Sequence, residues 1–178
     1  MICHTKKFMF CHHGKCAGTS IKNALKESLP KLRKEMRPTI SGHLSLREMY
    51  DLIREHGNTP NDYLKFTVVR NPWDRIVSWY YHWQKIQDVK VDFDHFVKER
   101  KMPYKHLDKM DFILQFENIR KDWTKLCRKL DIPRVGLPHV QYSTNRPKRD
   151  YKQYYNDESR DLVAERHKEV IEMFDYKF

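Results

Sequence analysis

FMFCHHGKCAGTSIKNAL, residues 8–25, is the most informative stretch of this chain. Its first four residues are apolar and predict a short buried strand, and the apolar residues that follow the loop recur at helical spacing. The loop between them holds two of the chain's five glycines, Gly14 and Gly18, together with Lys15. We expect the glycines to let a ligand approach the N-terminus of the helix, where unpaired N–H groups attract anions.

A second stretch, FTVVRNPWDRIVSWYYH at residues 66–82, repeats the order of strand, basic residue and helix. Asn71 and Pro72 are typical of the N-cap and the first position of a helix. A third apolar run at residues 112–116 precedes another helical pattern. Strands that alternate with helices predict an α/β fold, with a short central parallel sheet between two helical layers.

The remaining helices follow from caps and apolar spacing. Ser45 and Glu48 form a capping box that starts a helix, and Gly57 ends it. Short or amphipathic helices are also predicted at residues 93–97 and 119–130, and one last helix runs from about residue 157. No internal repeat or low-complexity segment interrupts the chain, so we expect a single domain over residues 1–178.

The composition of the 178 residues limits the class of protein. Hydrophobic residues make up 39% and charged residues 33%, a balance typical of folded rather than disordered chains. The formal net charge of +11 favours an anionic partner such as a nucleotide, an acidic glycan, a nucleic acid or a membrane surface. No apolar run approaches the roughly 18 residues of a membrane span. The four cysteines do not have the spacing that is typical of secreted, disulfide-bonded proteins. We therefore expect a soluble, cytoplasmic protein.

The first loop allows two other interpretations. In one, Thr19 or Ser20 simply caps the helix and Lys15 is a solvated surface residue. In the other, the loop is the G-x-x-x-x-G-K-[ST] motif of a nucleotide kinase, but here three residues separate the glycines and the lysine follows the first of them. A clear magnesium-binding Asp after a strand is also missing from the sequence, which disfavours the kinase.

Three further alternatives concern the rest of the chain. Arg70 can fork onto a phosphate with Ser78 beside it, or it can pair with Asp74 while Ser78 packs as a small residue. A nucleic-acid-binding module is disfavoured, because we expect no helix with a concentrated Arg/Lys stripe. A zinc site is disfavoured by the lack of paired C-x-x-C spacing. Its possible ligands would be Cys3, His4, Cys11, His12, His13 and Cys16.

Both loops resemble a known family. HHGKCAGTSI resembles the 5′-phosphosulfate-binding loop, and VVRNPWDRIVSWY the 3′-phosphate-binding segment, of sulfotransferases that use 3′-phosphoadenosine-5′-phosphosulfate (PAPS). ISGHLSL, FILQFENIRKDWTKLCRKLDI and YYNDESRDLVAERHKEVIEMFDYKF extend the resemblance to the carbohydrate branch, which includes heparan and chondroitin sulfotransferases. The sequence departs from the pattern at Gly14, where proline is common, and at Cys16.

The resemblance implies a P-loop-like nucleotide-binding sulfotransferase fold and a sulfuryl transfer from PAPS to an acceptor hydroxyl, expected to belong to a carbohydrate. It makes Lys15 and His43 the catalytic residues, with His43 as the base for in-line attack, and it requires no metal. Arg146 and Lys148, in the basic run NRPKRDYK, could close over the nucleotide. The implied PAPS-binding residues are Lys15, Cys16, Ala17, Gly18, Thr19, Ser20, Arg70, Ser78, Arg146 and Lys148.

Overall fold

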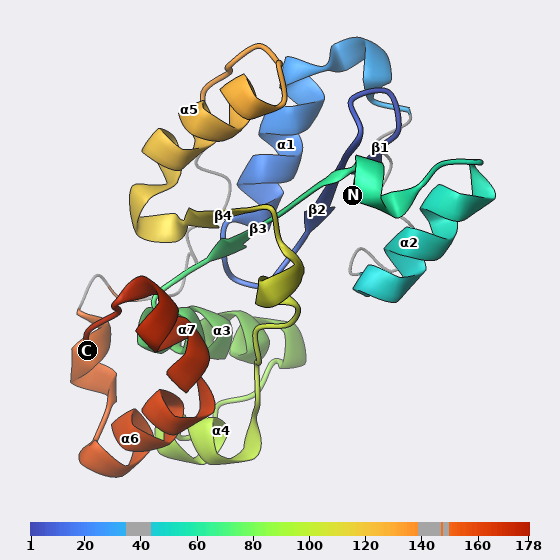
Figure 1. The fold of residues 1–178 in the computed structure, drawn as a ribbon. Helices are drawn as coiled ribbons and strands as arrows, with labels where there is room; N and C mark the ends of the chain where they lie inside the picture. The colour runs from blue at the N-terminus through green and yellow to red at the C-terminus, as the bar shows by residue number, and fades with distance from the viewer. Residues whose placement is uncertain (35–43, 139–146, 148–149) are drawn as a thin grey trace. The chain divides into compact units, whose positions relative to one another are not determined.

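A computed structural model describes residues 1–34, 44–138, 147 and 150–178. The chain divides into two compact units. The first unit comprises Met1–Val69 and His106–Val140, and the second comprises Arg70–Lys105 and Gln141–Phe178. Figure 1 shows a sheet with helices in the first unit and helices in the second. That residues 1–178 act as a single domain stays a prediction.

The described residues of the first unit form a four-stranded sheet in the order β1-β2-β3-β4. Its strands are β1 (Ile2–Cys3), β2 (Phe8–Cys11), β3 (Leu64–Val69) and β4 (Phe112–Gln115). The last three are parallel neighbours, as predicted, with Phe10 opposite Phe66 and Phe66 opposite Phe112. The predicted central parallel sheet is confirmed, and one further strand at its edge, β1, pairs antiparallel with β2. A two-residue strand is too short to produce a readable sequence pattern.

Where the structure describes the chain, three helices cover this sheet: α1 (Gly18–Ser28), α2 (Leu46–Glu55) and α5 (Ile119–Lys129). Figure 1 shows α1 and α5 on one side of the sheet and α2 on the other, which confirms the layered α/β prediction. The alternation of β2 explains this arrangement, since neighbouring side chains of a strand point to opposite faces. Met9 packs in a buried cluster with Met49 and Ile53 of α2. Phe10 points the other way and stacks on Phe66, with ring centroids 5.0 Å apart.

The predicted caps of α2 are confirmed. The Ser45 amide donates to the Glu48 carboxylate at 2.7 Å, and the Glu48 amide donates to the Ser45 hydroxyl at 3.2 Å. At the other end Gly57 has φ 71, a left-handed conformation that glycine adopts without a steric penalty. The hydroxyl and the amide of Ser45 both donate to the Glu48 carboxylate, and these hydrogen bonds lower the pKa of the Glu48 carboxyl.

The second unit contains α3 (Pro72–Gln87), α4 (Phe93–Glu99), α6 (Asp157–Arg166) and α7 (Lys168–Phe174). The sequence predicts one continuous last helix, but the structure has two, which meet at the buried His167. Short 3-10 helices occur at Pro30–Leu32, Pro60–Asp62, Leu107–Lys109, Phe116–Asn118 and Tyr151–Tyr154. Among the described residues, no helix is long and apolar enough to cross a membrane.

Aromatic side chains and one arginine hold α4 in the second unit. Phe93 and Phe96 of α4 lie 5.2 and 5.4 Å from Tyr80 of α3, between ring centroids. Arg166 of α6 donates to the carbonyls of Val97 and Lys98, the latter at 2.9 Å. A cation at the C-terminal carbonyls of a helix stabilises that helix. These contacts therefore fix the C-terminal end of α4, where the segment of residues 100–105 begins.

Candidate active site

The loop after β2 has an uncommon backbone conformation. Lys15 and Ala17 have φ 65 and φ 56, in the left-handed region that residues other than glycine seldom adopt. Between them lies Cys16, whose side chain is fully buried and whose thiol donates to the Gly14 carbonyl at 3.6 Å. Such strain persists only where the surroundings impose it, and it is concentrated at functional sites. The buried cysteine thus anchors a tightly turned loop that leaves Lys15 and Ala17 partly exposed.

The same loop leads directly into α1. Ala17 is the N-cap of α1, which has no side-chain cap and no acidic residue in its first turn. The interpretation in which Thr19 or Ser20 caps this helix is therefore wrong. Helical N–H groups at such an end, together with the helix dipole and successive turned amides, bind anions. The first turn, Gly18 to Ser20, places two partly exposed hydroxyl groups beside them.

Gly18 has a different role from the expected one. A Cβ built at Gly18 would lie 1.8 Å from two atoms of the His12 imidazole, so the glycine makes room for this ring. His12 in turn lies against Phe10, with ring centroids 5.8 Å apart. The expectation that Gly18 clears space for a ligand is corrected by this contact: the space is taken by a side chain of the protein.

Thr67, a buried residue of β3, fixes the start of the loop. Its hydroxyl donates to the Cys11 carbonyl at 2.6 Å and lies 2.8 Å from Nδ1 of His13. A hydroxyl has one proton to donate, so Nδ1 of His13 carries the hydrogen of the second bond. The carbonyl at the end of β2 and the His13 ring are thus fastened to the neighbouring strand. Burial raises the pKa of the Cys11 thiol to about 11, which keeps it protonated at neutral pH.

The second candidate segment begins with Arg70 in the second unit. Its Nε and Nη2 lie 2.7 and 2.6 Å from one carboxylate oxygen of Asp74, and only 9% of Arg70 is exposed. The ion pair between Arg70 and Asp74, one of the two alternatives considered for Arg70 from the sequence, is therefore present. Ser78 is buried one helical turn beyond Asp74, on the same face of α3. Asn71 caps α3 as predicted, accepting from the Trp73 amide at 3.1 Å.

Tyr104 is a residue that the sequence does not point to. Its hydroxyl accepts a hydrogen bond from the Arg70 amide at 3.2 Å and donates one to the Arg70 carbonyl at 2.6 Å. It lies 34 residues further along the chain, in a segment without helix or strand, so no local pattern marks it.

The predicted residues fall into groups. Lys15, Cys16, Ala17, Gly18, Thr19 and Ser20 lie together on the loop and first turn of the first unit, and Arg70 and Ser78 lie in the second unit. His43, Arg146 and Lys148 lie outside the described residues. Within the part of the chain that the structure describes, no three His, Cys, Asp or Glu side chains are arranged to hold a metal ion.

Helix α5 carries a cluster of basic residues that differs from expectation. Lys121, Lys125, Arg128 and Lys129 are exposed at spacings that place them along one side of the helix. The only acid of the helix, Asp122, is buried; it accepts from the Gln115 amide at 3.1 Å and forms an ion pair with Lys125 at 3.1 Å. The expectation that no helix carries a concentrated basic stripe is therefore wrong for α5.

Comparison with known proteins gives one match. The model of a family described as the sulfotransferase family matches residues 1–102, which include the loop around Lys15 and the segment around Arg70. The comparisons with curated proteins and with solved structures find no match.

Proposed function

Because the chain belongs to the sulfotransferase family, we propose that it transfers a sulfuryl group from PAPS to a hydroxyl group of a carbohydrate. Membership of the family supports sulfuryl transfer in general. The choice of donor, acceptor and base goes beyond the family match and rests on the residues discussed below.

The loop around Cys16 is the observation that carries the proposal. It joins two left-handed residues, Lys15 and Ala17, to a helix whose first turn has no side-chain cap and no acid. These groups suit a dianion: backbone N–H groups and two hydroxyls for its oxygens, and an ammonium for its charge. In the proposal, Lys15 to Ser20 hold the 5′-phosphosulfate of PAPS.

Lys15 would act on the leaving group. During transfer, the bond between sulfur and the bridging oxygen of the 5′-phosphate breaks, and a bond forms from sulfur to the acceptor oxygen. Negative charge develops on the bridging oxygen as adenosine 3′,5′-bisphosphate leaves. The ammonium of Lys15, positioned by the strained loop, would stabilise this charge more in the transition state than in the bound substrate.

His43 is the proposed base. An acceptor hydroxyl has a pKa far above neutrality, so its proton must pass to a base as the sulfur–oxygen bond forms. An imidazole titrates near neutral pH and suits this task. The assignment rests on the sequence SGHLSL, which lies directly before α2.

Arg70 and Ser78 are the proposed ligands of the 3′-phosphate. Arginine suits a phosphate because its planar fork gives two parallel charge-assisted hydrogen bonds. Asp74 already orients the guanidinium through Nε and Nη2. Arg146 and Lys148 are proposed as additional basic contacts, on the grounds of the run NRPKRDYK alone.

Charge supports an acidic carbohydrate as the acceptor. The chain has a formal net charge of +11, and the exposed side of α5 contributes four cations to it. A surface of this sign raises the local concentration of a polyanion. We further propose a cytoplasmic location, because Cys3, Cys11, Cys16 and Cys127 are all present as thiols.

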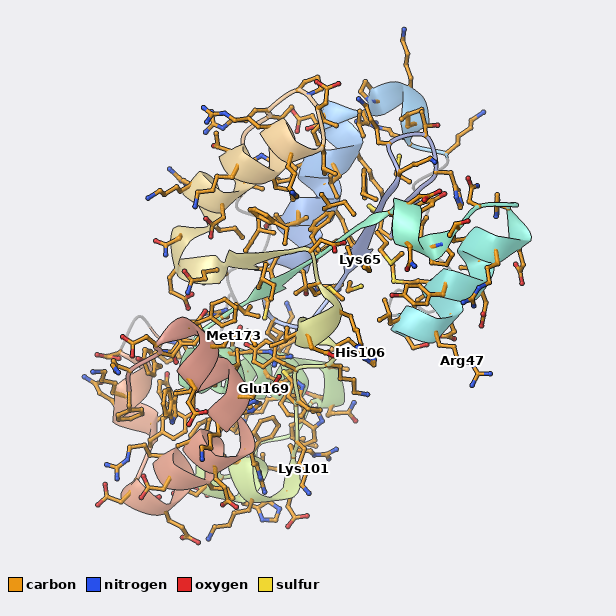
Figure 2. All side chains as sticks on the ribbon, in the orientation of Figure 1. Arg47, Lys65, Lys101, His106, Glu169 and Met173 are labelled. Atoms are coloured by element: carbon orange, nitrogen blue, oxygen red, sulfur yellow. The ribbon has the colours of Figure 1, made fainter. Side chains whose placement is uncertain are left out.

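Binding and transfer can be tested together. Calorimetry should detect adenosine 3′,5′-bisphosphate binding without Mg²⁺, and labelled PAPS should transfer its label to a member of a panel of acidic glycans, phenols and small alcohols. Lys15→Ala should abolish turnover while the circular dichroism spectrum stays unchanged. Arg47→Ala is the matched control, because Arg47 is exposed on α2 and projects away from it (Figure 2).

Two outcomes would contradict the proposal. Full activity of Lys15→Ala would remove the role of the loop, and binding of ATP with Mg²⁺ in place of the bisphosphate would favour a nucleotide kinase. For His43→Ala we expect a loss of about 10² to 10⁴ in kcat with nucleotide affinity retained, as for removal of a general base. Full kcat in this variant would assign the base role to another residue.

A further inference from the structure

Tyr104 holds the backbone of Arg70 through both of its polar groups. The phenolic oxygen is 3.2 Å from the Arg70 amide nitrogen, which donates to it, and 2.6 Å from the Arg70 carbonyl oxygen, to which it donates. Arg70 lies between the last residue of β3 and the N-cap of α3. At this junction the ladder of the strand has ended and the bonds of the helix have not begun. One hydroxyl therefore replaces the regular structure that would otherwise fix this residue.

The ring of Tyr104 is itself fixed on two sides. The guanidinium carbon of Arg75 lies 3.9 Å from its centroid, and Arg75 is only 2% exposed. Nη1 of Arg75 donates to the Met102 carbonyl at 2.9 Å, which ties the segment before Tyr104 to α3. The buried His167 ring stands edge-on to Tyr104 at 5.8 Å. A cation over an aromatic face, out of water, is a favourable contact, so the ring has little freedom to turn.

Arg70 is consequently held at both ends. Tyr104 fixes its backbone, while the carboxylate of Asp74 fixes its guanidinium at 2.7 and 2.6 Å. An arginine side chain that is ordered before binding loses less conformational freedom when an anion arrives. Preorganisation of this kind affects affinity for the group that the arginine contacts and has no direct effect on groups bound elsewhere.

We propose that Tyr104 is a positioning residue for the 3′-phosphate of the nucleotide, acting through Arg70. The inference rests on the proposed function, in which Arg70 contacts this phosphate. It predicts that loss of the hydroxyl lowers the preference for a nucleotide that carries a 3′-phosphate over one that lacks it.

The experiment measures this preference by calorimetry. Adenosine 3′,5′-bisphosphate and adenosine 5′-monophosphate are titrated into the wild-type protein and into Tyr104→Phe. We expect Tyr104→Phe to weaken binding of the bisphosphate about fivefold to tenfold, because the hydrogen bonds that position Arg70 are lost. Binding of the monophosphate should be unchanged. A general loss of structure would weaken both nucleotides equally.

Tyr80→Phe is the matched control. Tyr80 lies in the same unit, and its hydroxyl also donates to a backbone carbonyl, that of Val91, at 2.7 Å. Removal of this hydroxyl should leave the ratio of the affinity for the bisphosphate to the affinity for the monophosphate at its wild-type value. In the assay with PAPS, Tyr104→Phe should raise KM for PAPS and leave kcat unchanged, because the reacting atoms are not contacted.

Arg70→Ala separates failure of this inference from failure of the proposed function. If Arg70→Ala lowers the ratio and Tyr104→Phe does not, the role of Tyr104 is overturned while the function stands. If Arg70→Ala leaves the ratio unchanged, the assignment of the 3′-phosphate to this segment fails. If Tyr104 acts only through Arg70, the double variant Arg70→Ala/Tyr104→Phe should bind the bisphosphate no more weakly than Arg70→Ala alone.

A second variant covers the case in which Tyr104→Phe does not fold. Arg75→Lys keeps the hydroxyl and the positive charge but removes the planar group from the face of the ring. It should lower the ratio in the same direction by a smaller factor. If Tyr104→Phe does not fold, an unchanged ratio in folded Arg75→Lys would overturn the inference.

Discussion

The imidazole of His12 occupies the space in front of the Gly18 α-carbon, so that a Cβ there would lie 1.8 Å from two ring atoms. The ring packs between the start of α1 and Phe10, whose ring centroid is 5.8 Å away. The position of the first turn of α1 thus depends on the close fit of the His12 ring against Gly18, which has no Cβ.

Gly18→Ala should therefore destabilise the protein and displace the loop. Overpacking of this kind costs about 1 to 3 kcal/mol, and chemical denaturation would measure it as a fall in the free energy of unfolding. Adding His12→Ala should restore part of that loss, because the clash disappears with the ring. Gly136→Ala is the control, since nothing lies within 4 Å of a Cβ at Gly136. Equal stability of Gly18→Ala and the wild type would rule out the tight fit.

The ion pair of Arg70 and Asp74 should contribute more to stability than an exposed pair. Their side chains are 11% and 18% exposed, and a charge left alone at such depth is poorly solvated. A double-mutant cycle to alanine should give a coupling free energy of about 1 to 3 kcal/mol. Lys168 and Glu172 form a pair of the same spacing that is 75% and 66% exposed, and its cycle should give less than about 0.5 kcal/mol. Similar values from both cycles would contradict the prediction.

His167 should make the protein less stable as the pH falls. Burial, together with the positive charges of Arg75 and Arg166, lowers the pKa of this imidazole from 6.5 to about 4. Between these two pH values the unfolded chain binds the proton and the folded chain does not, so the free energy of unfolding falls as pH drops from about 6.5 to about 4. The loss is at most about 3 kcal/mol, at roughly 1.4 kcal/mol for each pKa unit.

Urea denaturation at several pH values would measure this effect. Other groups titrate in the same window, so the comparison is with His167→Gln, which should show a weaker fall between pH 6.5 and 4 than the wild type. His95→Gln, at an exposed position in the same unit, should follow the wild-type curve. Parallel curves for the wild type and His167→Gln would assign the dependence to other groups.

Thr67→Val should loosen the start of the loop without leaving a cavity. The variant removes a hydroxyl that donates to the Cys11 carbonyl and accepts from His13, both within 2.8 Å. The carbonyl and the ring then lose a partner, which costs about 1 to 3 kcal/mol in the free energy of unfolding. Thr124→Val removes a hydroxyl bonded to a carbonyl within α5 at 3.0 Å and should change stability little. An equal cost for the two variants would show that the Thr67 contacts are not special.

The sequence predicts features that depend on neighbouring residues. The capping box of Ser45 and Glu48, the N-cap at Asn71 and the strand that enters the loop at Gly14 are local patterns, and the structure confirms them. Local patterns also predict that Arg70 follows a strand directly.

Contacts between distant residues could not be predicted in this way. Tyr104 reaches Arg70 from 34 residues away, and the choice of Asp74 as the partner of Arg70 depends on how far both side chains are buried. The sequence does not reveal which neighbour fills the space at Gly18, so the role that it predicts for this glycine is wrong. The sequence does not indicate the break at His167, because apolar spacing continues across it from α6 into α7.

The short strand β1 also has a consequence for behaviour at high concentration. Within the part of the chain that the structure describes, the sheet ends on one side with the two residues of β1 and on the other with the four of β4. An unpaired strand edge is a template for pairing with another chain, and very short edge strands reduce this risk. Edges this brief give a second molecule little to join, so the sheet resists growth into fibrils even when the protein is crowded.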